Sequence, residues 1–279
     1  MNWTIAVDSG CDLRNLENSD NINYKIAPLK ITIGDKSVED DNSISLEALQ
    51  DMLDNEKSKT GTACPSVEDW RLCMEEGDNI IAITISGEVS GSYQSAVIAK
   101  DMILEDEPHK NIFVLNTLSG SGSMTFLARR AAELIHEGKS FDEICTELSE
   151  RAKKTKPFFM IQNVDNLITN GRLNHIVGKA IKTLKLALVA TVSEKGDLEV
   201  ISKARNFKHA MDRCLDECLK RGYEGKKVII SHCLNLEGAK EFKRRLLEKY
   251  PLANVEIMRT SLLCGYYVEK GGIIASFED

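Results

Sequence analysis

The sequence IIAITISGEVSGSYQSAVIA, residues 80–99, contains a short apolar run followed by a turn rich in serine and glycine. Its first residues, 80–85, are mostly β-branched, which is typical of a strand buried on both faces of a parallel sheet. After the turn, apolar residues recur at helical spacing, and serine is a favoured N-cap, so we expect a helix to begin at Ser90 or just after it. The stretch therefore predicts a strand, a turn and a helix.

The predicted turn has the features of an anion site. Free N–H groups in the first turn of a helix carry partial positive charge, and the small residues Ser90 and Gly91 let a ligand come close to them. A carboxylate or a phosphate fits such a position. The competing interpretation is that Ser90 only caps the helix, a role that serine commonly has.

The rest of the chain also alternates strands with helices, which predicts an α/β protein whose N-terminal sheet is mostly parallel and whose C-terminal part is mixed. Strands are expected at 4–7, 111–115, 158–161, 184–192, 198–203, 227–231, 254–258 and 273–277, and residues 24–33 are expected to form one or two strands. Helices are expected to begin at residue 45 and to span about 124–136, 141–153, 164–168, 207–221 and 236–249. The segments 184–192 and 198–203 flank a short polar turn and predict an antiparallel hairpin.

Length and charge narrow the class of protein. The 279 residues exceed the usual size of one domain, and the pattern changes near Pro157, so we expect two domains, 1–156 and 157–279. A formal net charge of −7, with no basic run interleaved with aromatic residues, argues against a nucleic-acid-binding surface. The first residues lead directly into a predicted strand, so we expect no signal peptide, no transmembrane segment and a cytoplasmic protein.

The cysteines and histidines show no clear metal-binding pattern. The eight cysteines include no CxxC pair, which favours reduced thiols, and the five histidines never pair at ligand spacing. Cys214 and Cys218 are four residues apart, which suits a metal, but small hydrophobic residues on a buried helix face have the same spacing. We therefore expect no metal and no cofactor.

Two further turns contain candidate ligand-binding groups. In the segment KTGTACPS, residues 59–66, Ser66 and Asp69 predict a capping box, whereas Thr62 has no such role and is a candidate for a hydroxyl that faces a ligand. The segment NTLSGSGSM, residues 116–124, is similar to a phosphate loop only superficially, because it lacks the lysine of GxxxxGK[ST]. Nucleotide binding is therefore weakly supported, and a tight helix entry explains these glycines.

Taken together, several motifs resemble those of the DegV family, bacterial two-domain proteins that hold a long-chain fatty acid. VDSGCDL at 7–13 resembles the family's opening strand and Asp-Ser turn, and TACPS at 62–66 resembles its Thr-Ser-x-Pro-Ser segment. ISGEVSGSYQSA at 85–96 resembles its most specific signature, and NGRL at 170–173 is similar to its Gly-Gly-Arg-Ile turn. The resemblance covers nearly the whole chain.

The resemblance implies a binding site for a palmitate-like acid. It implies that Thr62 and Ser90, with Gly91 at the helix start, hold the carboxylate while the acyl chain is buried between the domains. Near the C-terminus, GYYVEKGG places Tyr267 where the family has a histidine. Tyr267 can hydrogen-bond an oxygen but cannot carry positive charge.

The resemblance also bears on partners. Some family members present the bound acid to a fatty acid kinase, and Arg172 and Arg205 match arginines that contact that partner. The expectation is a lipid-binding protein that is not itself an enzyme. Tyr267 in place of the histidine weakens the case for a kinase partner in this chain.

The main alternative is an acyl hydrolase with Ser90 as the nucleophile. Such an enzyme needs a base and an orienting acid, and His232 with Asp8 is the only plausible set. A nucleophile elbow reads GxSxG, and EVSGS lacks the first glycine. A phosphate-binding module and an interaction protein without a small ligand are two further alternatives.

Overall fold

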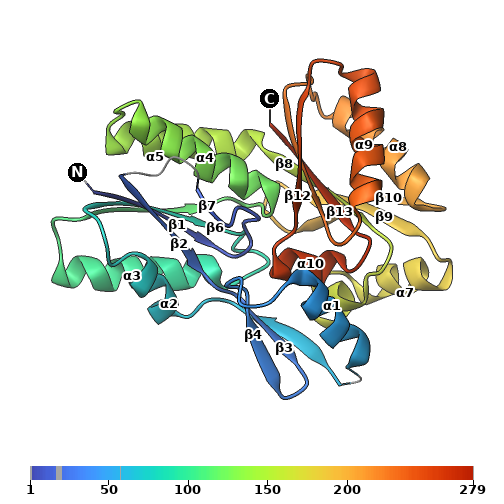
Figure 1. The fold of residues 1–279 in the computed structure, drawn as a ribbon, viewed down its shortest axis with the longest axis horizontal. Coiled ribbons are helices and arrows are strands. Elements are labelled where there is room, and N and C mark those ends of the chain that lie inside the picture. Colours follow the sequence, from blue (N-terminus) through green and yellow to red (C-terminus); the bar gives the residue numbers. More distant parts are fainter. Residues whose placement is uncertain (1, 17–20, 57, 279) are drawn as a thin grey trace.

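The computed structural model describes residues 2–16, 21–56 and 58–278 of the chain. Within these residues the chain forms three β-sheets with helices packed around them (Figure 1). A parallel sheet and a larger mixed sheet lie side by side, and a small antiparallel sheet lies next to both. The predicted α/β class is confirmed.

The parallel sheet confirms the prediction for residues 80–85. Its strands, in spatial order, are β2 (Ile22–Ala27), β1 (Trp3–Asp8), β6 (Asn79–Thr84) and β7 (Asn111–Asn116), and every pairing is parallel. One face is covered by α2 (Val67–Cys73) and α3 (Ser92–Asp106), the other by α4 (Gly122–His136) and α5 (Phe141–Lys154). Ile80 and Ala82 pack in the core with α2 and α3, whereas Ile81 and Ile83 pack in the core with α4 and α5. This alternation is what a strand buried on both faces requires.

The mixed sheet contains most of the C-terminal half of the chain. Its strands, in order, are β10 (Leu198–Ala204), β9 (Ala187–Val192), β8 (Lys156–Ile161), β13 (Ile273–Glu278), β11 (Lys227–His232) and β12 (Asn254–Arg259). Strands β11 and β12 are parallel and the other neighbours are antiparallel, including the predicted β9–β10 hairpin. On one face lie α8 (Phe207–Lys220) and α9 (Leu236–Lys249), and on the other α6 (Asp165–Thr169), α7 (His175–Thr183) and α10 (Leu262–Val268).

The small sheet links the two halves of the chain. Its strands, in spatial order, are β4 (Lys36–Glu39), β3 (Lys30–Ile33) and β5 (Thr60–Ala63), and both pairings are antiparallel. Helix α1 (Leu46–Asn55) lies between β4 and β5 in the sequence. Ile31 and Leu49 from this part share one hydrophobic core with Leu173 and Tyr266. That core contains residues from both sides of the predicted boundary at 156/157, and the division into two domains stays a prediction.

Several elements refine or differ from the sequence prediction. Helix α3 begins at Ser92, just after Ser90 as expected, but its N-cap is Gly91, so Ser90 does not cap the helix. Residues 24–33, expected to form one or two strands, form two, and these belong to different sheets.

Strands β4 and β5 and helices α7 and α10 were not predicted. The four-residue strands and the seven-residue α10, which is apolar on nearly all sides, show no clear periodicity. In α7, Val177 and Ile181 do have helical spacing, and this signal was missed.

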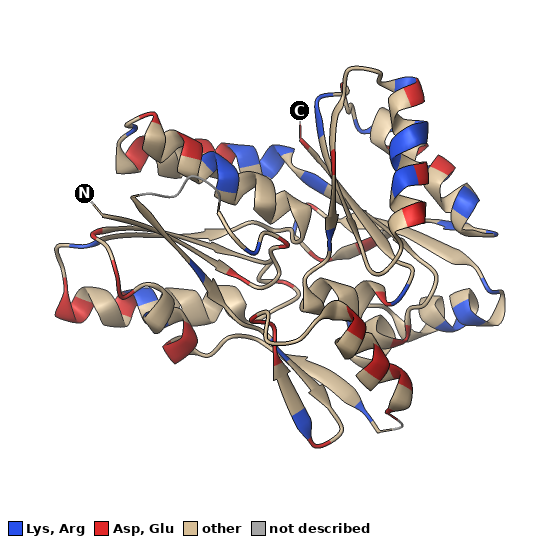
Figure 2. Cartoon of the chain, viewed as in Figure 1, with Lys and Arg blue, Asp and Glu red and all other residues tan. Residues whose placement is uncertain are grey.

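Charged side chains are mixed on the outer helices. Figure 2 shows Lys and Arg interspersed with Asp and Glu along α4, α5 and α9. Arg130, for example, pairs with Glu133, Glu137 and Glu147. Among the helices of the described residues, none combines the length and the apolar character needed to cross a membrane.

Candidate functional site

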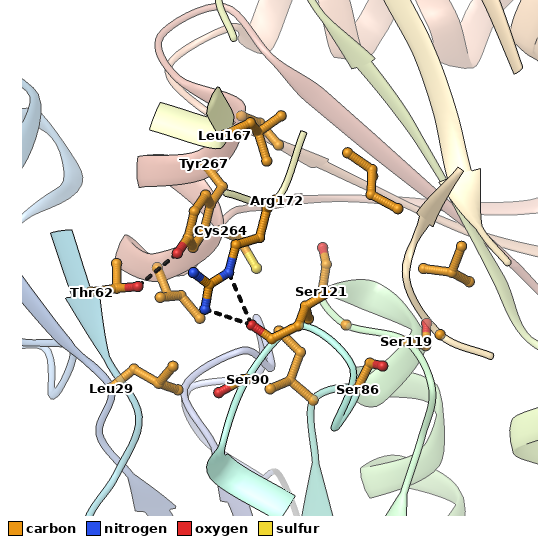
Figure 3. Close-up of a pocket in the computed structure, with 18 of the residues that line it drawn as sticks. Leu29, Thr62, Ser86, Ser90, Ser119, Ser121, Leu167, Arg172, Cys264 and Tyr267 are labelled. Carbon is orange, nitrogen blue, oxygen red and sulfur yellow. Dashed lines mark hydrogen bonds between the residues drawn. The ribbon is translucent and has the colours of Figure 1, made fainter. Parts of the chain in front are cut away.

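A cavity of about 370 Å³ lies at the carboxyl edge of the parallel sheet, where ligands commonly bind in α/β proteins. The loops after β6 and β7 form one side of it, and α10 and the β9–β10 hairpin form the other (Figure 3). Its apolar lining includes Phe159, Leu167, Val192, Leu198, Val268 and Ile274. Hydroxyl groups and one guanidinium group also line the cavity. The space therefore suits an amphiphilic ligand.

Four predicted site residues come together at this cavity: Thr62, Ser90, Gly91 and Tyr267 all line it. Thr62 Oγ1 and the Tyr267 hydroxyl form a hydrogen bond of 2.6 Å, in which either group can donate (Figure 3). Two hydroxyls that share one hydrogen bond retain one proton that can be donated to a third oxygen. The pair can therefore donate to a ligand carboxylate.

The loop that contains Ser90 and Gly91 leads into α3. Ser90 Oγ accepts a hydrogen bond of 3.3 Å from the Ser92 N–H, so it meets one of the amides that the helix leaves unpaired. A Cβ atom on Gly91 would lie 3.0 Å from Cys64 Sγ, which also lines the cavity. The close contact explains why this position suits glycine. The remaining first-turn amides and the macrodipole of α3 favour an anion here.

The side chain of Asp8 holds this loop in place through hydrogen bonds. The side chain is fully buried, and its oxygens accept hydrogen bonds from Gly10 N at 2.9 Å, Ile85 N at 2.8 Å and Ser92 Oγ at 2.6 Å. Burial raises the pKa of Asp8 to about 6, although these three donors act in the opposite direction. The bond from the Gly10 N–H forms an Asx turn at the end of β1, and Asp8 also connects β1 to the start of α3.

Two buried aspartates hold α10, and with it Tyr267, in place. Asp12 Oδ1 accepts from the Ser261 N–H at 2.7 Å, and Asp40 Oδ2 accepts from the Leu263 N–H at 2.9 Å. Asp40 also pairs with Arg14. Burial raises the pKa of both carboxyl groups. Residues from the N-terminal part of the chain therefore determine where this C-terminal helix begins.

A second hydroxyl pair lies beside the first, outside the cavity lining. Thr60 Oγ1 and the Tyr266 hydroxyl are 2.8 Å apart, and Asn170 Nδ2 donates to the same tyrosine oxygen at 2.9 Å. Asn166 Nδ2 donates to the Tyr266 carbonyl at 2.8 Å. These contacts connect β5, α6 and α10 outside the cavity.

Glu269 follows α10 in a strained conformation. Its φ of 55° and ψ of 171° belong to a region that is normally restricted to glycine. Its carboxylate accepts a hydrogen bond of 3.1 Å from the Asn166 N–H at the start of α6. Burial raises the pKa of this carboxyl group. The capping contact compensates in part for the backbone strain.

Arg172 connects the two sides of the cavity. Its Nε and Nη2 donate to the Val89 carbonyl at 3.1 and 3.0 Å, as the dashed lines in Figure 3 show, and Nη1 donates to the Asn170 carbonyl. A second hollow of about 530 Å³ adjoins the cavity and shares Ser90 and Arg172 with it. Arg205 does not line either space; it is exposed just after β10.

The hydrolase alternative gains no support from the geometry. His232 does not line the cavity, and its Nδ1 accepts a hydrogen bond of 3.2 Å from the Asn235 N–H. Burial lowers the pKa of this histidine. The oxygens of Asp8 are engaged by the loop that contains Ser90 and not by an imidazole. Within the described residues, Ser90, His232 and Asp8 are not joined into a triad.

The cysteines lie mainly in the core. Cys214 and Cys218 are buried on the inner side of α8, as expected for small hydrophobic residues. Across residues 2–16, 21–56 and 58–278, no three His, Cys, Asp or Glu side chains are grouped in a way that would hold a metal ion.

Several residues at the cavity are not evident from the sequence, notably Ser119 and Ser121 in the loop after β7. The glycines of this loop indicate by themselves only a tight helix entry. The available signal was the order of elements: β6 and β7 are adjacent parallel strands, so the loops after them meet at the same sheet edge.

Comparisons with known proteins agree with this architecture. The family profile described as "Uncharacterised protein, DegV family" matches residues 2–278. A DegV domain-containing protein of Streptococcus gordonii is 36% identical over 279 residues, which are 100% of this chain and 99% of the relative.

Solved structures of DegV family proteins are also similar to this chain over nearly its whole length. The Streptococcus pneumoniae Fatty Acid Kinase (Fak) B3 protein loaded with linoleic acid is 35% identical, with a TM-score of 0.96 and coverage of 100% of this chain and 99% of that one. A DegV family protein from Eubacterium eligens loaded with heptadecanoic acid is 30% identical, with a TM-score of 0.94 and coverage of 99% of both chains.

Proposed function

This chain belongs to the DegV family, and we propose that it binds one long-chain fatty acid in the cavity as a lipid-binding protein and not as an enzyme. The carboxylate lies at Thr62, Ser90 and Gly91 beside Tyr267, and the acyl chain fills the apolar part.

The observation that carries this proposal is the position of the Thr62–Tyr267 hydroxyl pair. The pair lines an otherwise largely apolar cavity that also contains Ser90 at the start of α3. Hydroxyl donors and a helix N-terminus favour a negatively charged oxygen, while the apolar walls favour a hydrocarbon chain. A fatty acid combines both groups in one molecule.

The tail supplies most of the expected affinity. Each methylene removed from water contributes about 0.8 kcal/mol, so an acyl chain of roughly sixteen carbons gains far more than the head group does. The head group fixes the orientation of the ligand. We therefore propose a palmitate-like chain, in keeping with the linoleic and heptadecanoic acids carried by the S. pneumoniae and E. eligens relatives.

A kinase partner is the second part of the proposal. The polar hollow beside Ser90 and Arg172 gives a path by which a partner protein reaches the head group. Tyr267 offers only a dipole where a histidine can be protonated, so we expect a phosphorylated head group to be held weakly. Arg172 and Arg205 as partner contacts, and the cytoplasm as the location, stay predictions.

Native mass spectrometry of the purified protein, followed by extraction of the bound lipid, tests ligand binding directly. We expect close to one fatty acid per chain. After delipidation, acids of fourteen to twenty carbons should raise the melting temperature, because a ligand at 100 times its Kd stabilises the folded state by about 2.7 kcal/mol. If no acid in this series stabilises the protein, the proposal is wrong.

A further inference from the structure

The turn of the β9–β10 hairpin, residues 193–197, contains a buried glycine. Gly196 is buried although the residues on either side of it are exposed. The tip of a hairpin usually faces water, because a loop in the interior has to satisfy its backbone polar groups there. Gly196 also lines the cavity, together with Val192 before the turn and Leu198 after it. The turn therefore closes part of the cavity.

Gly196 has no room for a side chain. A Cβ atom at this position would overlap with Ser86 Oγ and would lie 3.1 Å from the Cα and Cβ atoms of Leu118. Ser86 belongs to the loop after β6, and Leu118 belongs to the loop after β7. The backbone of the turn therefore packs directly against both loops, and a residue with a side chain would prevent this close approach.

The turn and the two loops each have hydrogen bonds of their own. Within the turn, the Gly196 N–H donates to the Ser193 carbonyl at 3.1 Å, and the Ser193 N–H donates to the Asp197 carbonyl at 2.8 Å. On the other side, the Ser86 N–H donates to the Ser119 carbonyl at 2.8 Å, which joins the two loops. Two separately stabilised surfaces thus meet at Gly196. A methyl group there would move the turn away from the loops and enlarge the cavity.

The contact at Gly196 lies across the cavity from the head-group residues. Figure 3 shows Ser86 and Ser119 on the side of the cavity opposite Thr62. With the carboxylate at Thr62, the acyl chain extends toward the apolar residues that flank the turn. The position of the turn therefore limits how much of the chain fits.

We infer that Gly196 determines the length of acyl chain that the cavity accepts, because only glycine lets the turn close the cavity against the two loops. The inference rests on the proposed function, because it requires a fatty acid bound with its carboxylate at Thr62. Each methylene that fits into the cavity should lower the Kd by about fourfold. A methylene beyond the closed end finds no apolar space and has to bend the chain or displace the turn, so this gain stops.

The test is the chain-length profile, which is the Kd of each saturated acid of twelve to twenty carbons, measured by isothermal titration of the delipidated protein. For the unmodified protein we expect the Kd to fall by about fourfold per methylene up to a limit of about sixteen carbons and then to stop falling. Gly196→Ala should move this limit to longer chains, because the added methyl group pushes the turn away from Ser86. Combining it with Ser86→Ala removes the obstructing oxygen and should move the limit back toward that of Ser86→Ala alone.

Gly222→Ala is the matched control for backbone strain. Gly222 also has a positive φ, 87° against 98° at Gly196, but a Cβ atom on Gly222 would have nothing within 4 Å. The control variant should have a lower melting temperature, because alanine is strained at a positive φ. Its chain-length profile should equal that of the unmodified protein.

Val192→Ala keeps the inference testable if Gly196→Ala does not fold. Val192 is buried and lines the cavity next to the turn, so its truncation enlarges the same part of the cavity and should also extend the limit. A folded Gly196→Ala variant with an unchanged limit, a Val192→Ala variant with an unchanged limit, or a shifted limit in Gly222→Ala would overturn the inference while the proposed function stands. If no acid binds to the unmodified protein, the proposed function itself fails.

Discussion

Thr62→Val and Tyr267→Phe each remove one hydroxyl from the pair whose oxygens lie 2.6 Å apart. One proton of the pair is used internally, so the pair has one proton left to donate to a carboxylate. A hydrogen bond to a charged group contributes about 1.5 to 3 kcal/mol, which is roughly ten- to a hundredfold in Kd. Each single variant keeps one hydroxyl whose proton is no longer used within the pair and can be donated to the carboxylate, whereas the double variant keeps none, so we expect the loss in the double variant to exceed the sum of the two single losses.

The assay is a double-mutant cycle measured by isothermal titration of palmitate into the delipidated proteins. The neighbouring pair Thr60 and Tyr266 provides the control, because its hydroxyls lie 2.8 Å apart but do not line the cavity. Thr60→Val with Tyr266→Phe should lower the free energy of unfolding and leave the Kd for palmitate nearly unchanged. Additive losses in the Thr62 and Tyr267 cycle, or no loss in its double variant, would refute the placement of the carboxylate at this pair.

Three further predictions follow from buried or substituted groups. Burial raises the pKa of Asp8 from 3.8 to about 6, so the folded state binds this proton more tightly than the unfolded chain does. The contribution of Asp8 to the free energy of unfolding is therefore complete below about pH 4 and decreases by ~3 kcal/mol as the pH rises through about 6. Urea unfolding of the wild-type protein and of Asp8→Asn at matched pH values should show this relative loss. Tyr267→His should increase acyl-phosphate formation with a fatty acid kinase; efficient formation on the unmodified protein with no gain from histidine would contradict our argument about charge. Glu269→Gly should be more stable than Glu269→Ala by about 1 kcal/mol. Both variants lose the hydrogen bond to the Asn166 N–H, but only glycine relieves the backbone strain at a φ of 55°. Equal melting temperatures of the two variants would show that the strain is not significant.

The sequence predicted the parallel sheet well because the signal there is local. Residues 80–85 are apolar and β-branched without alternation, which only a strand covered on both faces explains, and β6 is buried along its full length. The capping box of Ser66 and Asp69 was likewise predicted from spacing and is present at the start of α2. Such features depend on neighbours within a few residues.

Thr62 and Ser90 were predicted as ligand-binding candidates from the turns in which they occur, whereas Tyr267 was predicted only through the family resemblance. Thr62 lies on β5, a four-residue strand with no periodicity, and Tyr267 lies on α10, whose almost complete burial removes the polar face that usually reveals a helix. No local pattern indicates that these two residues, 205 positions apart, share a hydrogen bond.

The tertiary structure alone decided which groups meet at the cavity. Asp12 and Asp40 set the start of α10 through backbone N–H groups more than 200 residues away, and Arg172 reaches Val89 across the cavity. The physical reason is that secondary structure reflects short-range backbone and burial preferences, which are written in the local sequence. A binding site instead depends on which distant side chains are brought together and which polar groups remain unpaired, and only the packed fold determines that.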